Sequence, residues 1–453
     1  MPRSSTIDLA PPAEKAFLVA VDTGDDPGWN AQDSLAELAS LAETAGALVV
    51  GAEWQNRRHV DPNWYVGKGK AEELVAAKAE TGFDLLVADD ELSPGQQKAL
   101  ESLLGVKVID RSRLILDIFA QHARTHEGRL QVELAQLEYQ LPRLTRLWTH
   151  LSRTGGGIGT RGPGESQLET DRRLIRERIK KMKERVEQVR QQRATAARGR
   201  DRRLYPTVAI VGYTNAGKST LLNTLVGSEV ALAEDRLFAT LDPTSRQVKL
   251  GDGQTAIVTD TVGFIHKLPH QLVDAFRATL EEVTRADVLI EVVDGSDAHF
   301  AEHRVTVQTV LDELGAGTKP RLIAFNKADL LVASGGTPVN GMAAGGAAVS
   351  VATQAPIVAG SVLVSALTGF GLDALRDEVA ALLASLWEDV DVGVPYAAGE
   401  LLARVRERGT VEVEYGQRDV HVRGRVAPAL AGELLAAAAR WTESLREAEP
   451  TDA

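Results

Sequence analysis

The sequence contains no cysteine among its 453 residues, so disulfides and metal sites built from thiolates are both excluded. It has no apolar run of membrane-spanning length, and its N-terminus, MPRSSTIDLAPPAEK, lacks the apolar segment of a signal peptide. The missing cysteine also fits a reducing compartment. Together these features predict a soluble, unexported protein in the cytoplasm.

The charge of the chain is acidic overall but uneven. Lys and Arg number 51 against 63 Asp and Glu, a formal net charge of −12 that by itself argues against a nucleic-acid partner. Residues 171–203, however, hold 14 Lys or Arg against 5 Asp or Glu, a local charge of +9. This basic stretch is a candidate surface for an anionic partner, although a solvated, salt-bridged helix face would have the same composition.

The length predicts two to four domains, because 453 residues are too many for one hydrophobic core. Residues 1–15 are predicted to be disordered. Residues 16–127 alternate short apolar runs with helical stretches, which predicts a parallel α/β domain. The expected strands are 16–22, 47–53, 83–89 and 106–110, with helices around Leu35 and at 71–79, 96–104 and 114–123.

Residues 128–200 predict two helices that each carry a narrow apolar seam. Apolar residues recur at spacings of 3 and 4 from Leu130 to Leu151, and again from Ile175 to Val189. Pro142 lies inside the first seam, where we expect a kink. A glycine-rich break at 153–165 separates the seams, so the pattern predicts an antiparallel helical hairpin with a glycine-rich tip.

A second α/β pattern runs over residues 201–390, with an insertion at 333–359 that is rich in Gly, Ala and Ser and is predicted to be disordered. Residues 395–446 predict a helix, two strands and a helix, a small α+β module without a chemical signal. The expected strands of the second α/β domain lie near Val208, Ile257, Leu289, Ile323 and Val362.

The segment 212–219, GYTNAGKS, fits the phosphate-loop pattern G-x-x-x-x-G-K-[ST] and lies between a predicted strand and a predicted helix. Glycines let backbone amides turn inward around phosphates, and the helix N-terminus adds positive potential. We expect Lys218 to reach the β- and γ-phosphates and the Ser219 hydroxyl to bind Mg²⁺. An accidental glycine turn is the alternative.

Two further elements predict the Mg²⁺ and γ-phosphate contacts. In DTVG at 260–263, Asp260 is expected to hold Mg²⁺ through water and the Gly263 amide to meet the γ-phosphate. Thr244, in the loop LFATLDPTSR, is expected to close over Mg²⁺, unless it is an ordinary turn threonine beside Pro243. Lys218, Thr244 and Gly263 are therefore the predicted catalytic residues.

Two more elements predict the base. In NKAD at 326–329, the Asp329 carboxylate can accept hydrogen bonds from guanine N1–H and the exocyclic amine, whereas adenine presents an acceptor at N1. Asn326 and Lys327 are expected to brace the loop and the base. SAL at 365–367 is expected to supply a backbone amide to the guanine oxygen. The five elements together predict GTP or GDP as the ligand.

The predicted GTP-binding residues follow these ordered segments. They are Gly212, Tyr213, Thr214, Asn215, Ala216, Gly217, Lys218, Ser219, Thr220, Phe238, Ala239, Thr240, Asp260, Thr261, Val262, Gly263, Asn326, Lys327, Ala328, Asp329, Ser365, Ala366 and Leu367.

The five elements resemble those of the P-loop GTPases, and the sequence around them resembles the HflX family of ribosome-associated GTPases. The resemblance extends from about residue 16 to 387, whereas the tail and the insertion match less well. It implies an N-terminal α/β domain, a helical hairpin and a GTPase domain. The stretches that carry it are 65–74, 117–144, 155–173, 237–246 and 260–282.

The resemblance also implies a partner and a task. Family members bind the large ribosomal subunit and its rRNA and help split stalled or idle ribosomes, notably under stress, so we expect a monomer that associates peripherally with ribosomes. The glycine-rich tip is implied to approach rRNA near the peptidyl-transferase region, which agrees with the +9 stretch, because arginines pair with phosphates. The expected RNA-contacting residues are Gly155, Gly156, Gly157, Arg161, Gly162, Gly164, Arg172 and Arg173.

Phe264 follows DTVG, where many GTPases have a glutamine that orients the attacking water. A phenyl ring cannot make that hydrogen bond, so hydrolysis is expected to be slow until the ribosome or another group completes the site. Asn215 resembles an asparagine that helps to coordinate K⁺ in GTPases without the glutamine. The alternative is that Asn215 only shapes the loop.

Two other classes of protein stay open at this point. The first is an ATP-dependent RNA-remodelling protein with a second nucleotide site in the N-terminal domain. Its candidate is VGKGK at 66–70, which lacks the phosphate-loop spacing and is better interpreted as a turn into a helix. The second is a scaffold whose bound nucleotide only sets its conformation.

Overall fold

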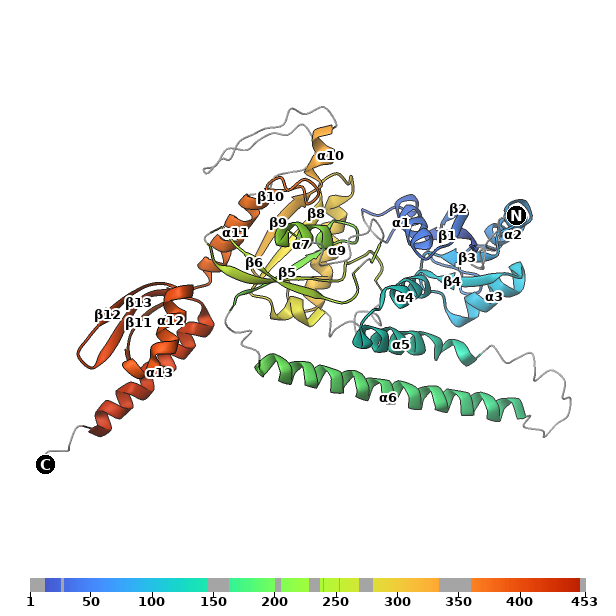
Figure 1. Ribbon diagram of the computed structural model, residues 1–453. Helices are drawn as coiled ribbons and strands as arrows, with labels where there is room; N and C mark the ends of the chain where they lie inside the picture. Colours follow the sequence, from blue (N-terminus) through green and yellow to red (C-terminus); the bar gives the residue numbers. More distant parts are fainter. Residues whose placement is uncertain are drawn as a thin grey trace, which may run out of the picture. The chain divides into compact units, whose positions relative to one another are not determined.

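The computed structural model divides into two compact units, each made of three segments of the chain (Figure 1). The first contains Met1–Gln191, Glu234–Asp242 and Val262–Thr279; the second contains Gln192–Ala233, Pro243–Thr261 and Leu280–Ala453. The first unit therefore includes two short segments that the sequence analysis assigned to the GTPase domain. The structure describes residues 13–25, 28–145, 163–199, 205–227, 237–238, 240–251, 253–268, 280–333 and 360–448.

The N-terminal part of the first unit is a four-stranded parallel sheet in the order β2-β1-β3-β4. All four strands and four helices lie where the apolar pattern predicts them, which confirms the parallel α/β prediction. Helix starts follow local chemistry: Asn30 caps α1, and Ser93 and Gln96 form a capping box at α3. The elements are β1 Lys15–Asp22, α1 Ala31–Thr44, β2 Leu48–Asn56, α2 Lys68–Thr81, β3 Leu85–Ala88, α3 Pro94–Leu104, β4 Lys107–Asp110 and α4 Arg111–His122.

The strand order reverses between β1 and β3. From β1 the chain moves outward to β2, then returns across β1 to β3 and continues to β4. The carboxyl ends of β1 and β3 therefore meet at the topological switch point, where open α/β sheets place their functional crevice. Asp22 ends β1 at this edge, and Asp89 follows β3.

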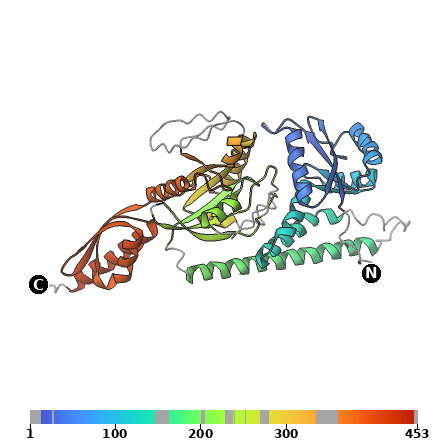
Figure 2. The same ribbon diagram turned by 45° about the horizontal axis from the view of Figure 1, so that its top comes forward.

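The helical hairpin consists of α5 (His126–Gln140) and the long helix α6 (Pro163–Gly199). The two helices run in opposite directions (Figure 1), and α6 is one continuous helix (Figure 2). Leu130 and Leu134 of α5 are buried together with Ile179 and Met182 of α6. The two predicted seams thus pack against each other as expected.

Two details of the hairpin prediction are wrong. The first helix ends at Gln140 and a short 3-10 turn, η1 (Arg143–Thr145), follows, so Pro142 terminates the helix instead of kinking it. Proline lacks the N–H that the helix needs there. In addition, α6 already begins at Pro163, so Gly164, predicted in the tip, belongs to the helix. The remaining tip residues, 153–162, lie outside the described part of the chain.

The second unit contains a six-stranded sheet in the order β10-β9-β8-β5-β7-β6. The five predicted strands are confirmed, but β6, which pairs antiparallel to β7, lies in a stretch that the sequence analysis took as a loop. Of its residues only Val248 is buried, so β6 has no apolar alternation. The elements are β5 Thr207–Gly212, α7 Lys218–Val226, β6 Thr244–Lys249, β7 Thr255–Asp260, β8 Val288–Asp294, α9 Phe300–Glu313, β9 Arg321–Asn326, α10 Ala328–Ala333, β10 Ser361–Leu363 and α11 Leu372–Ser385.

The C-terminal module has three antiparallel strands, in the order β11-β13-β12, where the sequence predicted two. The additional strand begins at Glu388, so the module starts before the predicted boundary at 395. Its buried Val390 and Val394 alternate with charged and small residues, which hid the pattern. The elements are β11 Glu388–Pro395, η4 Tyr396–Ala398, α12 Gly399–Arg408, β12 Thr410–Tyr415, β13 Asp419–Val426 and α13 Pro428–Ala448.

None of the helices in the ranges that the structure describes is long and apolar enough to cross a membrane.

Candidate nucleotide-binding site

The phosphate loop joins β5 to α7, the strand–turn–helix arrangement that the motif predicts. Gly212 has a φ of +150°, and a Cβ atom there would lie 2.2 Å from the backbone oxygen of Val292. Gly217 has a φ of +91°, and a Cβ atom there would lie 2.3 Å from Asn326 Nδ2. Both glycines are therefore required by the close approach of a neighbouring strand and loop.

Lys218 is buried at the start of α7, and its Nζ donates a hydrogen bond to the backbone oxygen of Tyr213, 2.6 Å away. Burial lowers the pKa of Lys218 to about 8, although the negative charge of Asp260 opposes the shift. The hydroxyl of Thr214 is also buried and has no hydrogen-bond partner among the described residues. A buried lysine and a buried, unsatisfied hydroxyl on a glycine-rich loop suit a phosphate.

The predicted Mg²⁺ residues lie together at the end of β7. Ser219 Oγ donates to Asp260 Oδ2 at 2.7 Å, and Asp260 is completely buried. Its neighbour Thr261 donates from Oγ1 to the backbone oxygen of Ile210, which ties the end of β7 to β5. A hydroxyl and a carboxylate oxygen are donors that Mg²⁺ prefers, so these residues fit the ion.

Thr244 is the first residue of β6 and lies opposite Asp260 in the strand register. Its predicted position in a loop is therefore wrong, because backbone pairing with β7 extends this far. The backbone pairing places Thr244 opposite Asp260, and its contact with Mg²⁺ stays a prediction.

Asn326 connects the phosphate loop to the predicted base-binding segments. Its Nδ2 donates to the backbone oxygen of Ala216 at 2.8 Å, and its Oδ1 accepts from the backbone amide of Ala366 at 2.9 Å. Both ends of the side-chain amide are thus used, one on each loop. Asn326 thus links the phosphate loop to the SAL segment, and its predicted role at the base stays a prediction.

Asp329 is held at the start of α10, where Ser365 Oγ donates to its Oδ1 at 2.5 Å. Lys327 has a φ of 62° and forms an ion pair with Asp294 at 2.7 Å. The backbone amide of Ala328 donates to the backbone oxygen of Val364, the residue before SAL, so this bond and the Ser365–Asp329 bond hold the NKAD and SAL segments together. The side chain of Leu367 is exposed, with 77% of its surface accessible.

Of the remaining predicted residues, some belong to the first unit and some lie outside the described chain. Phe238 belongs to the first unit, where its ring lies 4.6 Å from that of Phe119. Val262 and Gly263 also belong to the first unit, and Phe264 after them is 1% exposed. Among the predicted RNA-contacting residues, Arg172 and Arg173 lie on α6. Ala239, Gly155, Gly156, Gly157, Arg161 and Gly162 lie outside the described residues.

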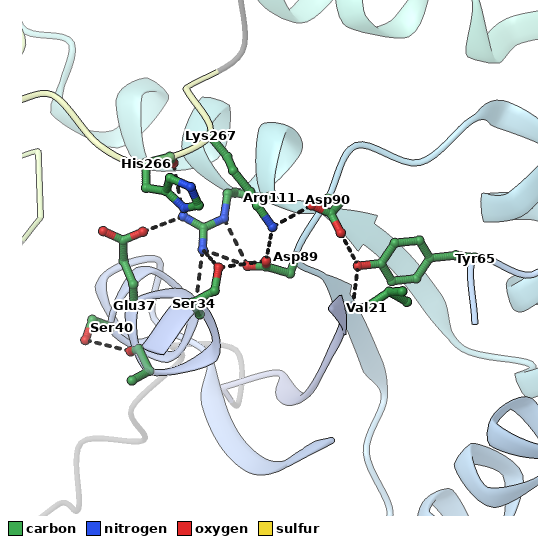
Figure 3. Close-up of polar contacts among 11 residues, drawn as sticks. Val21, Ser34, Glu37, Ser40, Tyr65, Asp89, Asp90, Arg111, His266 and Lys267 are labelled. Carbon is green, nitrogen blue, oxygen red and sulfur yellow. Dashed lines mark hydrogen bonds and ion pairs between the residues drawn. The ribbon is translucent and has the colours of Figure 1, made fainter. Parts of the chain in front are cut away.

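Sequence reasoning missed several residues that hold these loops. Asp294, at the end of β8, fixes Lys327, and Ser365 fixes Asp329. In the first unit, Asp89, Arg111 and Lys267 form a buried charge cluster that no motif indicated (Figure 3). The sequence could have indicated this cluster by the charged residues that directly follow two apolar strands, in VADD and VIDR.

The second nucleotide site finds no support. Gly67 caps α2, and its amide donates to Gln55 Oε1, so VGKGK is the predicted turn into a helix. Lys70 is engaged by Glu53 and Glu73, at 3.2 and 2.5 Å, which satisfies its charge with carboxylates instead of a phosphate.

A phosphate loop braced by a guanine-specific loop on a mostly parallel sheet is the arrangement of the P-loop GTPases, and this chain is a GTPase of that class. Residues 207–327 match the family described as "50S ribosome-binding GTPase". Residues 32–120 and 122–200 match "GTP-binding GTPase N-terminal" and "GTP-binding GTPase Middle Region".

Similarity to curated relatives shows the family to which this chain belongs. The chain is 45% identical to the GTPase HflX of Caldanaerobacter subterraneus subsp. tengcongensis over 422 residues, 92% of each chain. It is 48% identical to the GTPase HflX of Escherichia coli (strain K12) over 318 residues, 70% of this chain and 74% of the relative. The chain belongs to the HflX family of GTPases. Among solved structures, it resembles a GTP-binding protein of Sulfolobus solfataricus in complex with GDP, at 24% identity and a TM-score of 0.39, over 82% of this chain and 98% of that chain.

Proposed function

We propose that this GTPase binds the large ribosomal subunit and its rRNA, and that it couples GTP binding and hydrolysis to the splitting or rescue of stalled or idle ribosomes. The proposal places it in the cytoplasm as a monomer that associates peripherally with ribosomes. The observation that carries it is the surface of α6. The family description of residues 207–327, which names the 50S subunit, and the HflX relatives support the same partner.

Helix α6 separates its apolar and basic residues. Ile179 and Met182 pack against α5, whereas Lys180, Lys181 and Arg185 are exposed. Two other basic residues, Arg178 and Lys183, are paired with Glu133 and Glu138 of α5 and thus help to hold the hairpin together. The hairpin therefore presents a row of cations on a long rigid helix, which suits RNA phosphates.

The proposal assigns roles within the GTP site. Lys218 would neutralise the β- and γ-phosphates, Gly263 would donate its amide to the γ-phosphate, and Asp329 would select guanine. Ser219, Thr244 and, through water, Asp260 would hold Mg²⁺, which supplies positive charge to the phosphates when bound. Because the phenyl ring of Phe264 can neither donate nor accept a hydrogen bond, it cannot orient water, so hydrolysis by the isolated protein is slow and the ribosome stimulates it.

Sedimentation of ribosomes tests the proposal directly. Ribosomes are incubated with the full chain and GTP, a non-hydrolysable GTP analogue or GDP, and the fraction of separated subunits is measured. We expect subunits to accumulate with GTP and the analogue but not with GDP. Intact ribosomes under all three conditions would refute splitting.

Two variants locate the RNA contact. Reversal of charge at Lys180, Lys181 and Arg185 should abolish co-sedimentation with the large subunit, and deletion of residues 155–164 should abolish ribosome-stimulated hydrolysis. The matched control reverses three exposed lysines elsewhere, Lys15, Lys68 and Lys249. Equal loss in the control would show that net charge, and not α6, governs binding. Nucleotide affinity should be unchanged in all of these variants.

A further inference from the structure

The side chain of Tyr213 leaves the phosphate loop and stacks on a histidine of α9, His303. The two ring centroids lie 3.9 Å apart, and the ring planes are within 12° of parallel. Tyr213 is 6% exposed, so its ring is buried where the phosphate loop meets α9. Both residues belong to the second unit, together with the whole phosphate loop. The loop is therefore held by a side chain that lies outside its own motif.

The backbone oxygen of Tyr213 fixes the cation of the phosphate loop. It accepts a hydrogen bond from Lys218 Nζ at 2.6 Å and another from the backbone amide of Ala216 at 3.4 Å. A tilt of the Tyr213 peptide would move the acceptor of both groups at once. The orientation of Tyr213 therefore determines where Lys218, the residue expected at the β- and γ-phosphates, is held.

Helix α9 gives His303 a firm base. The next residue, Arg304, donates from Nε to Glu291 Oε1 of β8 at 3.1 Å, and Glu291 is 1% exposed. Val307, one turn further along α9, is 2% exposed. The turn that carries His303 is thus joined to the sheet by an ion pair with a buried carboxylate and by apolar packing, so it does not yield easily when the phosphate loop moves.

The loop between β8 and α9, residues 295–299, orients the His303 ring. Asp297 Oδ2 lies 3.6 Å from His303 Nδ1, and its Oδ1 accepts from the backbone amide of His299 at 2.8 Å. The same loop follows Asp294, which is paired with Lys327 of NKAD. One stretch of chain therefore contacts the base-binding segment at its start and, through His303, the phosphate loop at its end.

We propose that His303 is a positioning residue for the nucleotide: it holds the Tyr213 ring, so that the backbone oxygen of Tyr213 keeps Lys218 in place for the phosphates. The inference depends on the GTPase activity and not on the proposed action on ribosomes. Without the stack, the phosphate loop would have to become ordered when the nucleotide binds, and that ordering reduces affinity.

The experiment measures the affinity of the full chain for GDP with Mg²⁺ present, by titration calorimetry. An aromatic pair contributes about two- to tenfold to an equilibrium constant, so we expect His303→Ala to bind GDP about three- to tenfold more weakly than wild type. His303→Phe should restore the affinity to within about twofold, because a phenyl ring can stack on tyrosine.

The matched control is His421→Ala. It breaks a pair between a histidine and an aspartate, His421 and Asp391, in the C-terminal module of the same unit. The affinity for GDP should not change in this variant. A loss equal to that of His303→Ala would show that the effect is not specific to the phosphate loop, and would overturn the proposal.

A double-mutant cycle tests whether His303 acts through Tyr213. Tyr213→Leu fills the same buried position without an aromatic ring, so His303→Ala in this background should weaken GDP binding by less than about twofold. If the further loss is as large as in the wild-type background, His303 acts independently of Tyr213 and the proposal is wrong.

Two other results would contradict the proposal: wild-type affinity in a folded His303→Ala variant, and no recovery in His303→Phe. If His303→Ala does not fold, His303→Leu decides, since it keeps an apolar side chain on α9 but offers no aromatic face. We expect it to bind GDP at least about threefold more weakly than wild type. Unchanged affinity in His303→Leu would again refute the role of the stack.

Discussion

Ser219 and Asp260 are joined by a hydrogen bond of 2.7 Å from the serine hydroxyl to the carboxylate, which links the first turn of α7 to the end of β7. Ser219→Ala removes one oxygen that suits Mg²⁺ and leaves the buried carboxylate without this donor. We expect GTP binding in the variant to lose at least tenfold in affinity with Mg²⁺ present and far less with a chelator. Ser245→Ala, which removes a hydroxyl bonded to Thr259 in the neighbouring strand pair, is the control and should change neither value.

The base preference should follow Asp329. In Asp329→Asn an amide replaces the carboxylate, so the guanine donors lose their acceptor while the oxygen of xanthine gains a donor. We expect a preference of at least about a hundredfold to shift from GTP to xanthosine triphosphate. Competition between the two nucleotides measures it, with the exposed Asp373→Asn as control. Unchanged GTP affinity in Asp329→Asn would contradict the assignment.

Nucleotide affinity should depend on pH through Lys218. Burial lowers its pKa from the ordinary 10.5 to about 8, and bound phosphates would raise it. Below about pH 8 the lysine is charged both with and without bound nucleotide, so it contributes no pH dependence to nucleotide affinity. Above about pH 8, binding must take up a proton, so the affinity falls by up to about tenfold per pH unit.

Titration calorimetry of GDP between about pH 7 and about pH 9.5, in two buffers of different ionisation enthalpy, measures both the affinity and the proton uptake. Lys218→Met should bind more weakly and lose this dependence. A wild-type affinity that is constant over the whole range would contradict the assigned pKa.

A monovalent cation should act at Asn215, whose φ of 57° turns the phosphate loop at this position. With Phe264 in place of the catalytic glutamine, the charge that builds on the phosphates needs another cation, and an asparagine carbonyl is a ligand suited to K⁺. We expect faster hydrolysis in K⁺ than in Na⁺ at equal ionic strength, and no such difference in Asn215→Ala. Equal wild-type rates in the two salts would end the hypothesis.

Most of the fold and of the nucleotide site could be predicted from short sequence motifs and apolar runs. The phosphate loop, DTVG, NKAD and SAL are short segments whose consecutive residues are predicted to contact one ligand, so a sequence motif reveals each of them without the fold. The strands with apolar runs, such as β1 and β8, were equally visible because they are buried along their length. β6 and β11 were missed because their few buried valines stand among charged or small residues.

By itself, the sequence determined the class of nucleotide, the order of the motifs and the paired seams of the hairpin, since each depends on residues close together in the chain. Only the tertiary structure decided that Asn326 bridges Ala216 and Ala366, and that Lys267 and Arg111 meet on Asp89, 178 and 22 residues away in the sequence. Such pairs have no spacing that a pattern could reveal. Parallel strands bring their carboxyl ends to one edge of a sheet, so residues far apart in the sequence meet there. A buried carboxylate at that edge, such as Asp89, is stable only when cationic side chains pair with it.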